Sequence, residues 1–153
     1  MNKLIYLITG LAITVVFLVL ACSGDSTLNI FDRIYYNAEF NYSVYNESLY
    51  PMIAAIITVI AWGGAYLYYY IINSVNFDRW YHWAGVLLIV TLLAPVACYF
   101  LINGTLSSVG VNLGGSTLQF AIRLLAVTAA LFIVASFSMR WWSSNCRHTP
   151  IPQ

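Results

Sequence analysis

The first long apolar stretch of the chain decides its fold. Residues 4–22 read LIYLITGLAITVVFLVLAC and contain no charged side chain. An α-helix rises about 1.5 Å per residue, so a run of about 20 residues matches a hydrocarbon core of about 30 Å. The stretch therefore predicts a transmembrane helix.

Three further apolar runs follow it. Residues 51–72 begin with a proline, which suits the first position of a helix. Residues 83–102 form the next run, and residues 117–139 form the last. The last run is entered through STLQ at residues 116–119, which is typical of a capping box. These runs predict an all-α membrane protein, a four-transmembrane-helix bundle that forms a single integral domain over residues 1–153.

The composition agrees with this class. Hydrophobic residues make up 61% of the 153 residues and charged residues only 7%, whereas a soluble domain carries about a quarter charged residues. Lipid is therefore the expected solvent and the bilayer the first partner. Six Lys and Arg residues spread along the chain cannot form a stripe that follows phosphates, so we expect no nucleic-acid partner.

The basic residues orient the bundle. Lys3, Arg79, Arg140 and Arg147 all fall on one side of the four runs, which the positive-inside rule assigns to the cytoplasm. Both termini are then cytoplasmic, with an inner tail at residues 140–153. The loop of residues 23–50 is outside and carries four acids and one arginine, a net charge of −3. We expect a multi-pass protein of a bacterial inner membrane.

The outer loop of about 28 residues shows two patterns. Apolar residues from Leu28 to Ala38 recur at helical spacing, which favours an amphipathic helix on the outer interface. After it, Phe40, Tyr42 and Val44 alternate with polar residues, as in a strand. The loop is either a docking surface for a partner or a cap over the helix ends. The tail has no periodicity, and we expect it to be mobile unless a partner holds it.

The end of the first run resembles a bacterial lipoprotein signal. Residues 19–25 read VLACSGD, with a cysteine after small residues. The resemblance implies a lipidated Cys22 and removal of everything before it. Leu20 stands where a smaller residue is usual, and we favour a retained helix.

Arg123 is the one charge within a predicted span, about five residues past the capping box. A charge at that depth is a functional candidate by default. It can pair with a carboxylate of the outer loop, line a pore or attract an anion. The alternative is a long side chain that reaches up to the interface. We favour pairing with a loop carboxylate.

The segment between the last two runs reads TLSSVGVN at residues 105–112. It resembles the filter pattern of potassium channels, T-x-x-T-V-G-Y-G. The aromatic residue and the last glycine are missing, and so is a re-entrant helix that aims carbonyl groups at an ion. We expect a tight hairpin.

Small residues supply the other candidates for helix packing or partner contact. Pairs spaced by four residues allow helices to approach closely, and a proline in mid-span kinks its helix. The candidate residues are Arg123, Ala126, Ala130, Gly63, Gly64 and Pro95.

Two functional classes fit these observations. The spans contain no Asp or Glu, and His82 and His148 are not in mid-membrane, so we expect neither an enzyme nor a bound cofactor or metal. The first class is a non-catalytic subunit of a membrane assembly that packs against itself or other membrane proteins. The second is a homo-oligomeric pore, in which Arg123 and three threonines face a central path. The threonines are Thr58, Thr91 and Thr128.

Overall fold

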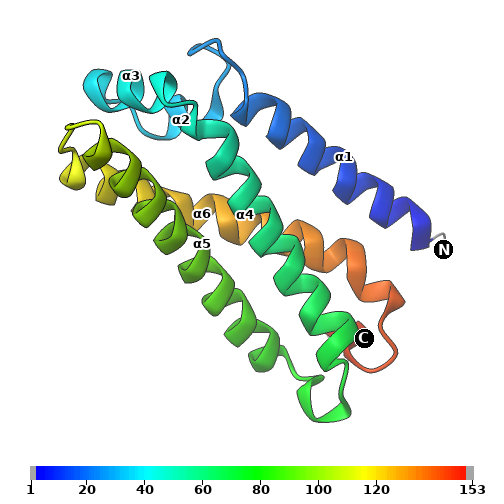
Figure 1. Cartoon of the computed structure of the whole chain (residues 1–153). Coiled ribbons are helices and arrows are strands. Elements are labelled where there is room, and N and C mark those ends of the chain that lie inside the picture. The colour runs from blue at the N-terminus through cyan, green and yellow to red at the C-terminus, as the bar shows by residue number, and fades with distance from the viewer. Residues whose placement is uncertain (1–2, 151–153) are drawn as a thin grey trace.

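Four long apolar helices pack side by side as a bundle, and short helices fill the connections (Figure 1). The computed structural model describes residues 3–150. Each of the four is long and apolar enough to cross a membrane, which confirms the predicted class. The long helices are α1 (Lys3–Ala21), α4 (Leu49–Tyr66), α5 (Trp80–Ser108) and α6 (Gly114–Met139).

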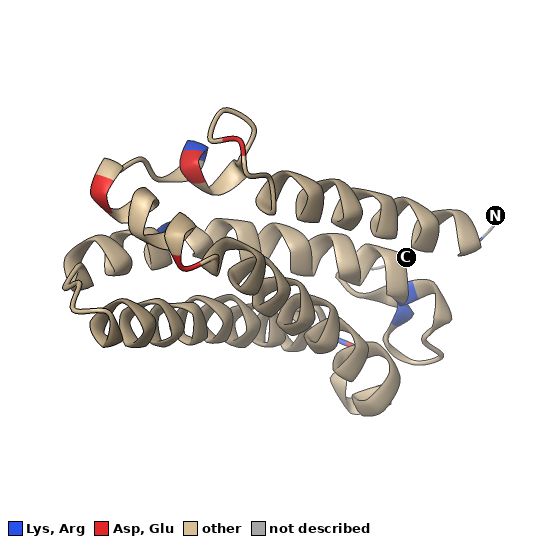
Figure 2. Cartoon of the chain, turned by 45° about the horizontal axis from the view of Figure 1, so that its top comes forward, with Lys and Arg blue, Asp and Glu red and all other residues tan. Residues whose placement is uncertain are grey.

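The short elements lie at the two ends of the bundle. Helices α2 (Ile30–Ile34) and α3 (Ala38–Asn46) connect α1 to α4. Helix α4 continues as the π-helix η1 (Leu67–Ile72), and α6 continues as the 3₁₀ helix η3 (Arg140–Trp142). The remaining 3₁₀ turns are η2 (Val75–Phe77) and η4 (Cys146–His148). Both termini lie at one end of the bundle, and the charged residues gather at its ends (Figure 2).

Helix α6 occupies the centre of the packing and touches α1, α4 and α5. Close approach depends on Gly64 of α4, where an added Cβ would stand 2.4 Å from Cγ2 of Val90 on α5. Phe132 of α6 packs on the same glycine, so Gly64 lies where α4, α5 and α6 meet. Gly63 has open space at its Cβ position and contributes nothing comparable.

Two contacts in the middle of α1 hold it against the bundle. At Gly10, an added Cβ would collide with the hydroxyl of Ser138 on α6. One turn later, the indole N–H of Trp62 on α4 donates to Thr14 Oγ1 at 3.0 Å, and Thr14 donates to the Gly10 carbonyl at 2.8 Å. The rest of α1 is largely exposed along its outer side, as lipid contact requires.

The α5–α6 connection is short, as expected of a tight hairpin. Residues 105–108 belong to the last turn of α5, so only residues 109–113 form the turn and the segment of residues 105–112 is not a filter-like loop. The predicted capping box at residues 116–119 is wrong, because α6 already begins at Gly114 and its N-cap is Leu113, which makes no side-chain cap. Thr117 instead donates to the Leu113 carbonyl within the helix.

The inner tail is folded onto the bundle up to residue 150, contrary to the expectation of mobility. The Asn73 side chain accepts hydrogen bonds from Ser143 Oγ at 2.8 Å and from the Asn145 backbone N–H at 3.0 Å. The Asn145 side chain returns a bond to the Asn73 carbonyl at 2.7 Å, and Tyr69 Oη donates to the Thr149 carbonyl at 3.1 Å. The tail has no apolar helical face to pack on the bundle. Hydrogen bonds to Asn73, in a loop distant in sequence, hold it in place instead.

Candidate functional site

The outer connection forms a compact cap over one end of the bundle (Figure 1). We call residues 22–48 the outer cap. Two short helices replace the single helix that the sequence predicts, because Asn29 and Asn37 each cap a new helix with their side chains. The strand-like pattern of Phe40, Tyr42 and Val44 does not form a strand, since these residues belong to helix α3.

An aromatic anchor fixes the outer cap to the helices. Phe31 of α2 is fully buried, and its ring lies 5.4 Å from Tyr50 on α4, 5.8 Å from Phe120 on α6 and 6.1 Å from Phe17 on α1. Phe40 of α3 packs on Phe120 at 5.3 Å. Burying one such ring contributes about 1.5–3 kcal/mol, so the outer cap is part of the hydrophobic core.

A buried carboxylate next to the anchor locks the outer cap further. Asp32 is 6% exposed, and its Oδ1 accepts from Tyr50 Oη at 2.7 Å and from Asn41 Nδ2 at 2.8 Å. Its Oδ2 accepts from Tyr45 Oη at 3.0 Å. Burial and the neighbouring Asp32 carboxylate raise the pKa of Tyr45 to about 12. We call these four residues the Asp32 cluster; its donors are all neutral groups.

Arg123 joins the outer cap by a route that differs from the favoured prediction. Its guanidinium Nη1 donates to the Ile34 carbonyl at the end of α2 and lies 5.1 Å from the centre of the Tyr35 ring. Tyr35 Oη in turn donates to Gln119 Oε1 on α6 at 3.3 Å. The backbone carbonyl takes the place of the expected carboxylate, because Asp32 is already occupied by its own cluster.

The outer side of the cap is exposed. Tyr36 is 79% exposed and Tyr42 is 69% exposed. The two aromatic side chains therefore project from a support that the anchor and the Asp32 cluster hold in place.

The three threonines of the pore hypothesis lie inside one bundle. The hydroxyls of Thr58 and Thr91 are buried with no hydrogen-bond partner among residues 3–150. Thr128 is fully buried and donates to the Leu124 carbonyl. None of the three hydroxyls lines the outer surface of a single chain.

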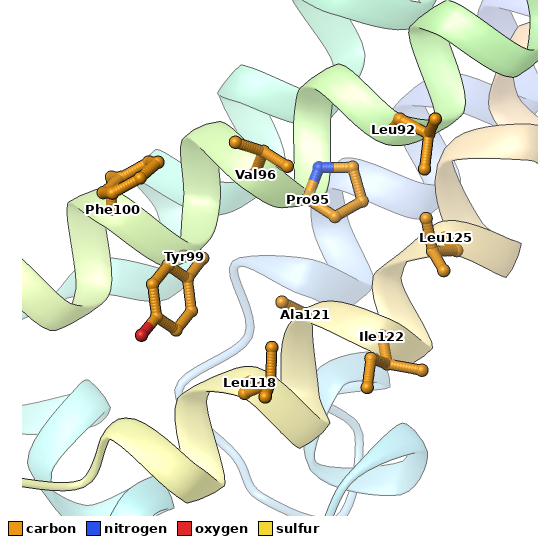
Figure 3. Close-up of a pocket in the computed structure, with 9 residues that line it drawn as sticks. All are labelled: Leu92, Pro95, Val96, Tyr99, Phe100, Leu118, Ala121, Ile122 and Leu125. Atoms are coloured by element: carbon orange, nitrogen blue, oxygen red, sulfur yellow. The ribbon is translucent and has the colours of Figure 1, made fainter.

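Three apolar grooves run along the lipid-facing sides, and each holds at least one predicted contact residue. The first, between α5 and α6, has a volume of about 300 Å³, and the buried Pro95 lines it together with Tyr99 of α5 and Leu118 of α6 (Figure 3). The second, between α4 and α5, measures about 360 Å³ and contains Gly63 and Gly64.

The third groove lies between α1 and α6 and measures about 370 Å³. Ala126 and Ala130 line it from α6, and Ile13 and Phe17 line it from α1. Both alanines are exposed in the single chain. Ile30 at the start of α2 closes the groove toward the outer cap. We call it the α1–α6 groove.

The predicted contact residues thus do not converge on one site. Arg123 contacts the outer cap, and the other five residues lie in three separate grooves. Sequence reasoning missed the Asp32 cluster, whose members are spread over residues 32–50. The available signal was an acid within IFDRI, a segment in which residues 30, 31 and 34 are apolar.

Within residues 3–150, no group of three or more His, Cys, Asp or Glu side chains is arranged to hold a metal ion. Comparisons with protein-family models, with curated proteins and with solved structures found no match to this chain.

Proposed function

We propose that this chain is a non-catalytic multi-pass subunit of a membrane protein assembly, and that a transmembrane helix of another subunit, or of a second copy, packs into the α1–α6 groove. The observation that carries the proposal is the position of Ala126 and Ala130. Both line the groove on its exposed side, where the single chain leaves them uncovered.

Small residues spaced by four allow two helix backbones to approach closely within a bilayer, where packing replaces the hydrophobic effect as the driving force. Three small residues of α4 serve the packing of the bundle itself, since Ala61, Gly64 and Ala65 are buried. The pair on α6 is different, because both alanines are exposed in the single chain.

The outer cap supplies a second surface for the same partner. Tyr36 and Tyr42 present large, rigid side chains at its exposed side, and tyrosine is favoured in interfaces because it combines apolar area with a hydrogen-bonding tip. Under the orientation that the basic residues indicate, this surface faces away from the cytoplasm, and its net negative charge favours a basic partner.

The experiment enlarges the two alanines. Ala126→Leu and Ala130→Leu fill the groove without entering the core, because both positions are exposed. Ala55→Leu is the matched control, since Ala55 is an exposed alanine on α4 outside the grooves. Each chain is purified from its native membrane in mild detergent, and its mass and its co-purifying subunits are determined.

The wild-type chain and Ala55→Leu are expected to retain the assembly, while the two groove variants release a folded single chain. A wild-type chain that runs as a monomer with no subunit attached would contradict the proposal. So would groove variants that keep the full assembly.

A further inference from the structure

The inner end of α6 contains a buried cation whose hydrogen-bonding groups are largely unused. Arg140 begins η3 and is 6% exposed. Its Nε and Nη1 are enclosed and have no hydrogen-bond partner within residues 3–150. The adjacent Trp141 has a buried indole N–H that also lacks a partner there. Three donors in two consecutive residues thus remain unsatisfied, which a folded protein rarely tolerates.

Aromatic rings cover the guanidinium. Its carbon lies 4.3 Å from the centre of the Trp141 ring and 5.3 Å from that of Phe137. A ring face attracts a cation but accepts no N–H bond as a carboxylate or phosphate oxygen does. Trp141 also stacks on Tyr6 of α1 at 5.2 Å, which places the start of α1 at this corner. Lys3 precedes Tyr6 by three residues and therefore shares its side of the helix.

The protein offers little negative charge at this end. Four of its five acids lie in the loop of residues 23–50, and the fifth is Asp78 in the inner loop. Asp78 does not neutralise Arg140, because Nε and Nη1 have no partner in the described part of the chain. A buried charge without a counter-charge is strongly unfavourable. Residues 3–150 therefore leave Arg140 without a counter-anion.

The depth of Arg140 indicates which anion is available. The segment Gly114–Trp142 has 29 residues. At about 1.5 Å per residue it spans about 43 Å, which exceeds a hydrocarbon core of about 30 Å. Its last turn then lies among the lipid headgroups, where phosphates are the abundant anions. Leu4 and Ile5 beside Tyr6 are both more than half exposed, and they offer apolar contact for acyl chains.

We propose that Arg140, Trp141 and Lys3 bind the phosphate of an anionic phospholipid headgroup at the inner surface of the membrane. Nη2 of Arg140 is the guanidinium nitrogen left to reach the surface, and it donates to a phosphate oxygen. The Trp141 indole N–H and the Lys3 ammonium supply further donors after small side-chain movements. An arginine–phosphate bond is charge-assisted and about twice as strong as a neutral one. An anionic headgroup carries no choline cation to repel the guanidinium, so this lipid is held more firmly than a zwitterionic one.

Native mass spectrometry of the full chain tests the proposal. The chain is loaded in detergent with phosphatidylglycerol, with phosphatidylcholine or with inorganic phosphate, and collisional activation strips weakly held molecules. The wild-type chain is expected to retain one phosphatidylglycerol after other lipids have left, with a preference of about tenfold over phosphatidylcholine. Equal retention of the two lipids would overturn the proposal. Retention of inorganic phosphate with no lipid would also overturn it, in favour of a soluble anion.

Three variants locate the site. Arg140→Gln is expected to lose the preference for phosphatidylglycerol, and Arg147→Gln, an exposed arginine of the same tail, is expected to keep it. Because Arg140→Gln is buried and risks misfolding, Trp141→Phe provides a milder change that removes one donor and keeps the ring. It should lower the preference by about threefold or more. A preference that survives Trp141→Phe and Arg140→Gln unchanged, or that falls equally in Arg147→Gln, would place the lipid elsewhere.

Discussion

Replacement of Asp32 by alanine should release the outer cap while the membrane helices stay folded. The change removes the acceptor of two buried donors, Tyr50 Oη and Asn41 Nδ2. An unsatisfied buried donor costs about 1–3 kcal/mol, so the pair costs about 2–6 kcal/mol. The third donor, Tyr45 Oη, is only partly buried and can bind water. Asp32→Asn keeps one oxygen for the two buried donors and loses only the charge, which costs about 1–3 kcal/mol.

Hydrogen exchange in detergent measures this effect, since the amides of α2 and α3 report opening of the outer cap. We expect faster exchange there for Asp32→Ala than for Asp32→Asn, with α5 unchanged. Glu39→Ala is the control, because Glu39 is an exposed acid on the same cap. If Asp32→Ala exchanged like Glu39→Ala, the Asp32 cluster would not stabilise the outer cap. If Asp32→Asn cost as much stability as Asp32→Ala, the loss would not come from leaving Tyr50 Oη and Asn41 Nδ2 without an acceptor.

Three further predictions concern other parts of the chain. Gly64→Ala should lower the free energy of unfolding in detergent by about 1–3 kcal/mol through a clash with α5, while Gly63→Ala should leave it equal or higher; similar losses would argue against the close approach. The raised pKa of Tyr45, about 12 against an ordinary 10.0, means that the neutral phenol stabilises the folded chain fully below pH 10 and loses this effect as pH rises through 12. Thermal unfolding of Tyr45→Phe should therefore decline less steeply over that interval, and an unchanged slope would remove Tyr45 as its source. A membrane-impermeant maleimide on intact cells should label the exposed Cys22. In detergent, where both ends of the chain are open to the reagent, Cys146, whose thiol is buried with a raised pKa, should react only after denaturation; rapid labelling of Cys146 in the folded chain would contradict the ordered tail.

The contact of Arg123 with the outer cap shows how far sequence reasoning can go. The residue type and its depth correctly indicated that the outer loop is within reach of the side chain. The partner was wrong, because the choice between a carbonyl and a carboxylate depends on whether Asp32 is free. Asp32 is not free, and its donors come from α3 and α4.

Sequence alone determined the number of long helices, their approximate bounds and the gathering of charges at the helix ends. These properties follow from local hydropathy and from the length that a bilayer requires, and neither depends on how the helices meet. The short helices of the outer cap escaped this reasoning, because Asn29 and Asn37 act as caps only in their folded positions.

Tertiary structure decided which small residues are used within the chain and which remain exposed. Gly63 and Gly64 are neighbours in sequence, yet only Gly64 meets α5 and α6. Ala126 and Ala130 were predicted as contacts and are uncovered in the single chain. A helix that is apolar on all sides carries no periodic signal for its buried face, so the rotation of each helix is fixed only by the side chains of its neighbours.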